Sequence, residues 1–434
     1  MAVPDPPSYT RRGMAAAIQT PILGGTRTPL RTRLIFSLLL LLLCASTLRY
    51  LHFFGQEHPL VRNDLIGRQF ATRAALHGIN PYSPDMTRQI QAVAGHDPGQ
   101  GFDYPILLAV LLAPFAALPW EALRVLFLLV SVPALALAFW QCLRLLHLRT
   151  RPAITVATIL LCLCSWPFIY ALRLQQPTLL VVAFTIPACY CLSRQRDVAA
   201  GLLLALATFK PQLVLPLLLW LLLWTGLHRR WKFLAAFLVG EALLLACGES
   251  LVPGWFPSWL ADTHRYRALG PVLPLQLVLG HPAGLLCTAA LVLWSLPRLW
   301  QLRRAAPGSP EFGSAIALVL AVTVCLAPML WAMVYNQILL VPAALLLLWS
   351  PRPAGAGLAA LARRTSQFLL LWTFASVPIA VLGLTFLPAS RLWICCPFLN
   401  YLLAPALVAA LLAGPLRQKT ALSAPLRTYS LSNP

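Results

Sequence analysis

Long apolar runs alternate with short polar segments along most of the chain, and residues 34–54, 177–192 and 233–252 are clear examples. A helix needs about 20 apolar residues to cross a hydrocarbon core of about 30 Å, and lipid offers no partner to unpaired backbone groups. These runs therefore predict membrane-spanning helices. We expect an all-α, polytopic membrane helix bundle of about 11–13 membrane helices, some of them short.

The other apolar runs predict further spans between short basic loops. The block 105–146 breaks at "LPWE", which predicts a short helix to about Leu118 and a longer one from Glu121. One of these two is expected to be a partial or re-entrant element, because the block has to end on the cytoplasmic side. Later spans are expected at about 153–171, 198–209, 212–227, 272–294, 313–330, 336–350, 366–387 and 397–414.

Positive charge is spread over the short loops and is not gathered in one segment. The chain has 33 Lys and Arg against 12 Asp and Glu, a net charge of +21, yet only 10% of its residues are charged. Cytoplasmic loops of membrane proteins carry such an excess of Lys and Arg, whereas nucleic-acid binding needs a clustered basic surface. We therefore expect no nucleic acid partner.

The sequence "RTR" before the first span places the N-terminus in the cytoplasm and divides the chain into three parts. Residues 1–33 are predicted to be a disordered basic cytoplasmic tail, residues 34–414 the membrane domain, and residues 415–434 a second cytoplasmic tail. The first external loop, residues 55–104, is expected to contain short helices and has five of the twelve carboxylates. Chemistry is therefore expected on the outer face.

Asp64 opens a predicted helix, Asp64–Leu76, shortly after the first span. His77 and Gly78 end this helix, and Arg68 lies one turn after Asp64, within reach of an ion pair. One interpretation is a solvated surface helix with an ordinary ion pair. The other is a carboxylate held where a lipid-linked substrate presents its head group.

Two further polar stretches border apolar runs. The segment "GFDYP" places Asp103 and Tyr104 at the edge of a span, where a tyrosine commonly anchors the interface. The segment "LRLQQPT" places Arg173, Gln175 and Gln176 at a turn between two spans. Amides at such a turn bind sugar hydroxyls or cap the turn, and both interpretations stay open.

Lys210 interrupts the apolar stretch "AGLLLALATFKPQLVLPLLLWLLL". A charge at the bilayer centre costs about 2.5–3.5 kcal/mol on insertion scales, so it normally faces a cavity, a partner or the interface. A phosphate is a natural partner for an ammonium group. Snorkelling of the side chain to lipid head groups is the alternative.

The segment "ADTHRYR" supplies Asp262, His264, Arg265 and Arg267 in another predicted external region. Two arginines near the surface suit a phosphate, whereas one His and one Asp are a weak metal signal. P-loop, GxSxG and HExxH patterns do not occur in the chain. We expect no cofactor and no metal site, and the sequence leaves metal dependence open.

The order of these stretches resembles the bacterial glycosyltransferase family 87. The similar segments are "ALHGINPYSPD", "FDYPILLAVLLAPFAALP", the Gln-Pro-Thr turn, "AGLLLALATFKPQ" and "APMLWAMVYNQILLVPAALLLL". They extend from about Asp64 to Leu348, and the similarity is strongest between Asp64 and Gln212. No single segment is decisive, and their order together makes the resemblance specific.

The resemblance implies a GT-C-like fold, the class of multispan enzymes that transfer a sugar from a polyprenyl-phosphate carrier. The family includes polyprenol-phosphate-mannose-dependent mannosyltransferases. It implies inverting transfer of a hexose, mannose in those members, at the outer face of the bacterial cytoplasmic (inner) membrane. The implied partners are a polyprenyl-phosphate-linked sugar donor, a glycan or glycolipid acceptor, and membrane lipids.

An Asp in the first external loop is the usual base of the family, and Asp64 occupies that position. The family's Gly-x-x-Pro-Tyr element matches Gly78, Pro81 and Tyr82. Its aromatic-Tyr-Pro-Pro element matches Phe102, Tyr104 and Pro105, with Ile106 in place of the second proline.

The later elements match with further substitutions. The Gly-Gln turn matches at Gln176, with Gln175 where Gly is usual, and the Lys-Pro element matches Lys210 and Pro211. The Ser-Pro…Tyr element matches Pro328 and Tyr335, with Ala327 for Ser. The His that mannosyltransferase members often carry near this element is absent, so the resemblance defines the reaction class more closely than the sugar.

These matches and the chemistry of the residues give one set of predicted site residues. Asp64 is the predicted general base. The predicted ligands of the donor phosphate are Lys210, Arg173, Arg265 and Arg267. The predicted substrate-binding residues are Arg68, Tyr82, Asp103, Tyr104, Gln176 and Tyr335.

A transporter or flippase of a lipid-linked or anionic substrate is the alternative function. It would also place a lysine and broken helices in the membrane. It predicts functional charges near the midplane and two similar halves, whereas this chain has its carboxylates concentrated in one loop and no clear internal repeat. The transferase is therefore the preferred interpretation.

Overall fold

The computed structural model describes residues 30–56, 63–94, 101–148, 150–267, 270, 272–328, 333–350, 357–386 and 398–413. It separates into two compact units, residues 1–42 and residues 43–434. The described part of the first unit is the start of helix α1 (Leu30–Gln56), whose leucines are largely exposed, as expected of a lipid-facing helix. The predicted tails lie outside the described residues, apart from residues 30–33.

The regular elements in the described part of the chain are helices, and the predicted all-α class is confirmed. After α1 they are α2 (Asp64–Leu76), α3 (Pro84–Ala94), α4 (Leu107–Leu112), η1 (Ala113–Phe115), α5 (Trp120–Leu145), α6 (Pro152–Leu163), α7 (Trp166–Arg173), α8 (Thr178–Ser193), α9 (Asp197–Leu206) and α10 (Pro211–His228). The second half contains α11 (Trp231–Leu251), α12 (Trp255–Arg267), α13 (Pro274–Leu279), α14 (His281–Leu302), α15 (Pro310–Leu326), η2 (Met333–Leu340), α16 (Val341–Trp349), α17 (Leu358–Phe386), η4 (Phe398–Leu402) and α18 (Leu403–Ala413).

Six helices are long and apolar enough to cross a membrane, and the bent pair α6 and α7, with an angle of 55°, brings the number to seven if it forms one span. Five shorter apolar helices of 10–17 residues accompany them in the described residues. The prediction of a polytopic bundle with several short helices is confirmed. The first predicted loop contains the short helices α2 and α3, as expected.

Two breaks in the apolar pattern have identifiable causes. The predicted partial element is α4, which with six residues is only about 9 Å long. The span predicted at 272–294 is instead the short helix α13 followed by the long helix α14. Gly280 between them has φ +80, a conformation that ends a helix, and Pro282 lies in the first turn of α14, where proline is well tolerated.

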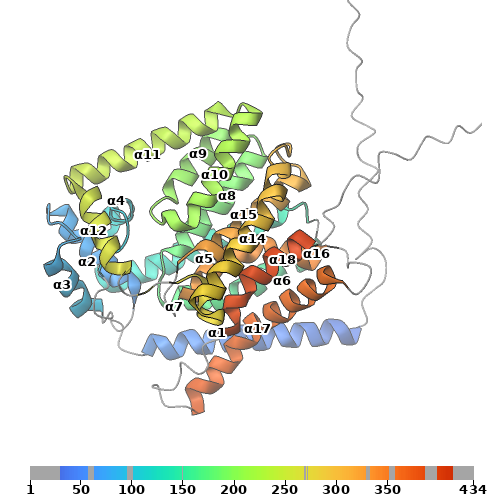
Figure 1. Ribbon diagram of the computed structural model, residues 1–434. Coiled ribbons are helices and arrows are strands. Elements are labelled where there is room, and N and C mark those ends of the chain that lie inside the picture. The colour runs from blue at the N-terminus through green and yellow to red at the C-terminus, as the bar shows by residue number, and fades with distance from the viewer. Residues whose placement is uncertain are drawn as a thin grey trace, which may run out of the picture. The chain divides into compact units, whose positions relative to one another are not determined.

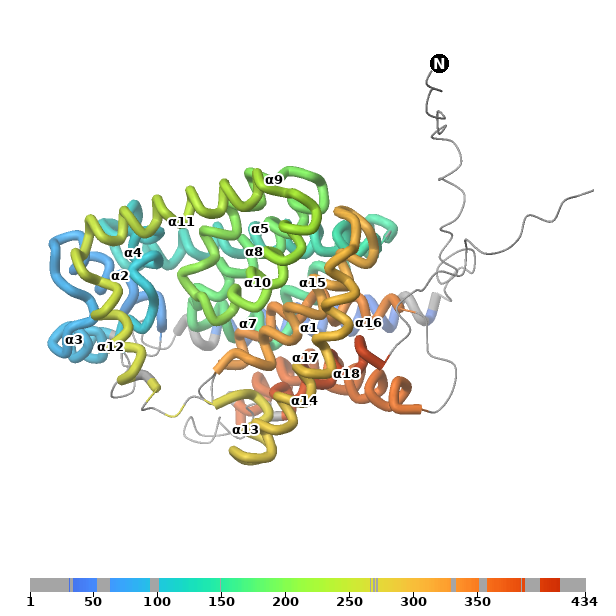
Figure 2. Tube along the Cα trace, turned by 45° about the horizontal axis from the view of Figure 1, so that its top comes forward, coloured from blue at the N-terminus to red at the C-terminus, as the bar shows by residue number. Residues whose placement is uncertain are grey.

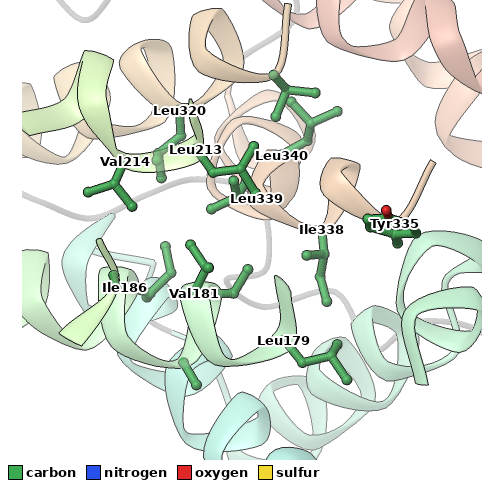
Figure 3. Close-up of a cluster of buried hydrophobic side chains, with 14 of the residues drawn as sticks. Leu179, Val181, Ile186, Leu213, Val214, Leu320, Tyr335, Ile338, Leu339 and Leu340 are labelled. Atoms are coloured by element: carbon green, nitrogen blue, oxygen red, sulfur yellow. The ribbon is translucent and has the colours of Figure 1, made fainter. Parts of the chain in front are cut away.

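The second unit is built around α8, which packs between α5 and α9, while α9 packs along α11. Figures 1 and 2 both show α11 running beside α9. Figure 3 shows apolar side chains from α8, α10, α15 and η2 meeting in the core, with Tyr335 at one side of the cluster. This packing holds the ends of α8 and α10 and the segment η2 against one another.

Gly201 of α9 allows the close approach of α9 to α11. A Cβ atom at this position would lie 2.5 Å from the carbonyl oxygen of Phe233 and 2.7 Å from the amide nitrogen of Phe237. These are backbone atoms, so the two helices would have to separate to relieve the clash. Small residues allow such close crossings in membrane bundles.

We expect Gly201→Ala to destabilise the protein by about 1–3 kcal/mol, because a methyl group has to be forced into a packed helix interface. Thermal unfolding of the purified protein in detergent measures the change. Gly226→Ala is the matched control, since a Cβ there meets nothing within 4 Å and Ala favours a helix. Equal melting temperatures for Gly201→Ala and the wild type would contradict the predicted clash.

Candidate active site

The start of helix α2 is attached to the turn between α7 and α8. The side chain of Asn63 caps the helix by accepting a hydrogen bond from the Leu65 amide at 2.9 Å, and its Nδ2 donates to Gln175 Oε1 at 2.8 Å. The Asp64 amide donates to the Leu174 carbonyl at 3.0 Å. The predicted helix Asp64–Leu76 is confirmed, and its first residue is held against the end of two membrane helices.

Most of helix α2 is buried, so the interpretation of a solvated surface helix is wrong. Asp64 itself retains some accessible surface although protein surrounds it. Burial raises the pKa of the Asp64 carboxyl, and the positive charges of Arg68 and Lys210 oppose this shift. Asp64 is thus a partly accessible carboxylate that is acted on by the charges of two cations.

Lys210 lies in the turn between α9 and α10, as predicted, with only 4% of its surface exposed. Its Nζ donates to Thr178 Oγ1 at 2.6 Å and to Asn336 Oδ1 at 3.2 Å. Thr178 Oγ1 also donates to Asn336 Oδ1 at 3.2 Å. These contacts point the ammonium group inward, so snorkelling to lipid head groups is excluded as its role.

The ring of Tyr104 lies close to both Arg68 and Lys210. The Arg68 guanidinium carbon lies 4.9 Å from the ring centroid and Lys210 Nζ lies 5.7 Å from it, while Lys210 Nζ is 4.9 Å from the ring of Tyr335. The electron-rich faces of the two rings help to stabilise the buried cations. The Tyr104 hydroxyl donates to Gln176 Oε1 at 3.2 Å, so this glutamine bridges segments and does not simply cap its turn.

Asp103 is a second partly buried carboxylate, next to Tyr104 in the sequence. Burial raises its pKa to about 6, Arg68 opposes the shift, and Asp262 adds to it. Asp103 has φ 56, and its conformation is held by local bonds: its Oδ1 accepts from the Gly101 amide at 3.2 Å, and its own amide donates to Asp262 Oδ2 at 3.3 Å. Arg68 Nη1 donates to the Gly101 carbonyl at 2.7 Å.

Arg265 and Tyr82 brace the same loop. Arg265 Nη2 donates to Asp262 Oδ1 at 2.7 Å and to the Tyr82 carbonyl at 2.6 Å, and the Tyr82 hydroxyl donates to the Tyr104 carbonyl at 2.9 Å. Helix α12 is thereby connected to residues 101–104. In this arrangement Arg265 is engaged with protein groups that position Tyr104.

The structure brings six of the predicted residues into one cluster, which we call the Lys210 cluster: Asp64, Arg68, Tyr104, Gln176, Lys210 and Tyr335. Tyr82, Asp103 and Arg265 adjoin it through the loop 101–104. The other two predicted phosphate ligands lie farther out. Arg173 lies over the ring of Tyr170 at 5.9 Å, which in turn stacks on Tyr335, and Arg267 is exposed in the last turn of α12.

The predicted site residues did not include Thr178, Asn336 or Asn63. Thr178 follows the Gln-Gln-Pro turn, and Asn336 lies in "MVYNQILL" between apolar residues, so each is a polar side chain bordering a hydrophobic run. Such residues usually face partners inside a bundle, and this was the available signal. Over the described residues, no group of three or more His, Cys, Asp or Glu side chains is placed to hold a metal ion.

Comparison with known proteins adds one finding to this geometry. The model of glycosyltransferase family 87 matches residues 102–270, which include Tyr104, Gln176 and Lys210. No curated protein and no solved structure matches the chain. Together with the membrane helices, the match identifies residues 102–270 as a glycosyltransferase family 87 region and the chain as a membrane glycosyltransferase.

Proposed function

We propose that this protein transfers a hexose from a polyprenyl-phosphate carrier to an acceptor hydroxyl at the outer face of the bacterial cytoplasmic membrane. The observation that supports this most directly is that Arg68 and Lys210 both lie over the ring of Tyr104 and that the positive charges of both act on the Asp64 carboxyl. Asp64 starts a helix outside the candidate spans, and Lys210 directly precedes one of them. A lipid-linked sugar phosphate has its reactive bond at this boundary between membrane and water.

Lys210 is our proposed ligand of the leaving phosphate. An ammonium group has three hydrogen-bond donors, and in the described structure two of them are used, by Thr178 and Asn336. A phosphate oxygen suits the third. Arg68 is a second candidate, because its buried Nε has no partner among the described residues. Cations held in a dry site stabilise the charge that develops on a leaving phosphate.

Asp64 is our proposed general base. It removes the proton from the acceptor hydroxyl as that oxygen forms a bond to the anomeric carbon. The bond from this carbon to the phosphate oxygen breaks, and polyprenyl phosphate leaves with the electron pair. A raised pKa brings a carboxylate closer to the operating pH, which favours its action as a base. One displacement inverts the anomeric centre, so a β-linked carrier sugar gives an α-linked product.

A buried lysine fits both a transferase and a transporter, so Lys210 alone does not distinguish the two functions. The match to a glycosyltransferase family supports the transferase. Mannose, the sugar of the mannosyltransferases in the resembled family, is the first donor sugar to test, and the proposed acceptor is a glycan or glycolipid. Membranes or purified protein supplied in turn with polyprenyl-phosphate mannose, glucose and galactose, each radiolabelled, test the donor. Retention of label on the carrier in all three cases would contradict a polyprenyl-phosphate-dependent transferase.

We expect Asp64→Asn to lower kcat/KM by about 10²–10⁴, because the amide cannot accept the acceptor's proton. The measurement is transfer of labelled sugar by purified protein, with expression and thermal stability checked in parallel. Asp85→Asn is the matched control, since this carboxylate lies on α3 and its side chain is 76% exposed. A loss of less than about threefold in Asp64→Asn would exclude Asp64 as the base.

We expect Lys210→Gln to lower kcat more strongly than it raises the KM for the donor, because the charge acts mainly on the departing phosphate. Lys210→Arg should recover activity only in part, since a planar guanidinium does not replace a compact ammonium. Lys232→Gln, at an exposed position near the start of α11, is the matched control. Full activity of Lys210→Gln would show that its hydrogen bonds have only a structural role.

Labelling should place helix α3 on the outer face. A cysteine introduced by Asp85→Cys, at a highly exposed position, is expected to react with an impermeant maleimide in intact cells. Arg194→Cys, exposed at the end of α8 in a basic loop, should react only after permeabilisation, because basic loops stay in the cytoplasm. Labelling of the wild type, which has cysteines of its own, gives the background to be subtracted. The opposite labelling pattern would reverse the proposed orientation.

A further inference from the structure

Helix α12 has two distinct faces. The inner face contains Trp255, with 4% of its surface exposed, and Asp262, with 1%. The outer face follows the spacing of four residues along a helix: Phe256 is 54% exposed, Leu260 is 44% exposed, and His264 is also exposed. Arg267 continues this stripe in the last turn. The exposed stripe therefore begins with apolar side chains and ends with basic ones.

Helix α12 directly follows a candidate span, which favours a position of the stripe near a membrane surface. Helix α11 is a candidate span that ends at Leu251, and α12 begins at Trp255 after a turn in which Gly254 has φ +70. Figures 1 and 2 show α12 turning away from the end of α11. Its 13 residues are about 20 Å long, too short to cross the hydrocarbon core. A helix that leaves a span in this way starts at the interface.

We propose that the outer face of α12 binds anionic phospholipid of the bilayer. Phe256 and Leu260 enter the boundary between head groups and acyl chains, and Arg267, with His264 beside it, contacts the lipid phosphates. Interfacial helices that combine exposed aromatic and aliphatic residues with basic residues bind to bilayers, and their affinity increases with the anionic lipid content. A free phosphate or a nucleic acid would not explain the exposed apolar half of the stripe.

This assignment separates the two arginines that the sequence suggested for the donor phosphate. Arg265 donates to Asp262 and to the Tyr82 carbonyl, toward the loop 101–104. Arg267 follows it by two residues on a helix, a rotation of about 200°, and therefore points to a different side. Arg265 positions the loop, while Arg267 belongs to the lipid-binding stripe.

Lipid binding to α12 also has a consequence for transfer, and this part rests on the proposed function. The inner face holds the Asp103 amide through Asp262, and Arg265 holds Tyr82, whose hydroxyl donates to the Tyr104 carbonyl. A lipid that holds α12 in place therefore steadies the loop that carries Tyr104 into the Lys210 cluster. Anionic lipid should then increase the rate of transfer.

Thermal unfolding of the purified full chain in detergent tests binding without any assay of activity. Dioctanoyl phosphatidylglycerol is the anionic probe, and dioctanoyl phosphatidylcholine and inorganic phosphate are the comparisons. We expect a rise in Tm with phosphatidylglycerol alone. Arg267→Gln should raise the concentration needed for half of this shift about fivefold, the effect of one basic residue near a charged surface.

Phe256→Ser combined with Leu260→Ser should also weaken the shift, whereas Arg88→Gln, which removes a 73% exposed arginine from α3, should leave it unchanged. Equal shifts with phosphatidylcholine would show that the surface does not select anionic lipid. Equal shifts with inorganic phosphate would identify a simple anion site. A wild-type response of Arg267→Gln would overturn the assignment of Arg267.

The second measurement compares transfer in vesicles of phosphatidylcholine alone with vesicles of roughly one-third phosphatidylglycerol, enough to give a marked negative surface potential. The wild type should be faster in the anionic vesicles, and Arg267→Gln should lose this difference. A higher KM for the donor in phosphatidylcholine vesicles, with the lipid effect intact, would return Arg267 to the donor site. Lipid-dependent Tm shifts without transfer would instead contradict the proposed function.

Discussion

The buried ammonium group of Lys210 is the constraint on which the arrangement of the site depends. A cation in a membrane protein interior has to be surrounded by partners, because neither lipid nor a dry core solvates it. Thr178, Asn336 and the rings of Tyr104 and Tyr335 supply these partners from three separate segments. The requirement to stabilise one charge thus brings together the start of α8, the segment η2 and the loop 101–104.

The Lys210 cluster is built at an edge of the membrane domain and not at its centre. Helix α2 lies outside the candidate spans, and its cap residue Asn63 is bonded to Gln175 in the turn before α8. This bond places Asp64 next to a site whose other members come from membrane helices. A carboxylate that remains partly accessible and a lysine that is buried are suited to different tasks, and in the transfer that we propose the first acts on the acceptor and the second on the donor phosphate.

A second layer of contacts supports the first. Asp262 of α12, itself held by Arg265, accepts a hydrogen bond from the Asp103 amide, while Arg68 of α2 donates to the Gly101 carbonyl. The loop contains Asp103 at positive φ, and such a conformation persists only where surrounding bonds maintain it. The orientation of Tyr104, and with it the environment of both cations, therefore depends on two helices outside the candidate spans.

The sequence by itself determined the class of the fold, the places of most helices and the position of Lys210 in a turn. Apolar run length, proline and glycine are local properties, and lipid makes backbone pairing within each helix obligatory. The span predicted at 272–294 was misplaced because a run of apolar residues does not show that Gly280 adopts positive φ.

Only the tertiary structure decided which polar residues meet. Asp64 and Lys210 are far apart in the chain. Thr178 and Asn336 stand out in the sequence only as polar side chains beside apolar runs, and packing decided that both bind one ammonium group. Such long-range pairing depends on how helices pack in three dimensions, which no local pattern specifies.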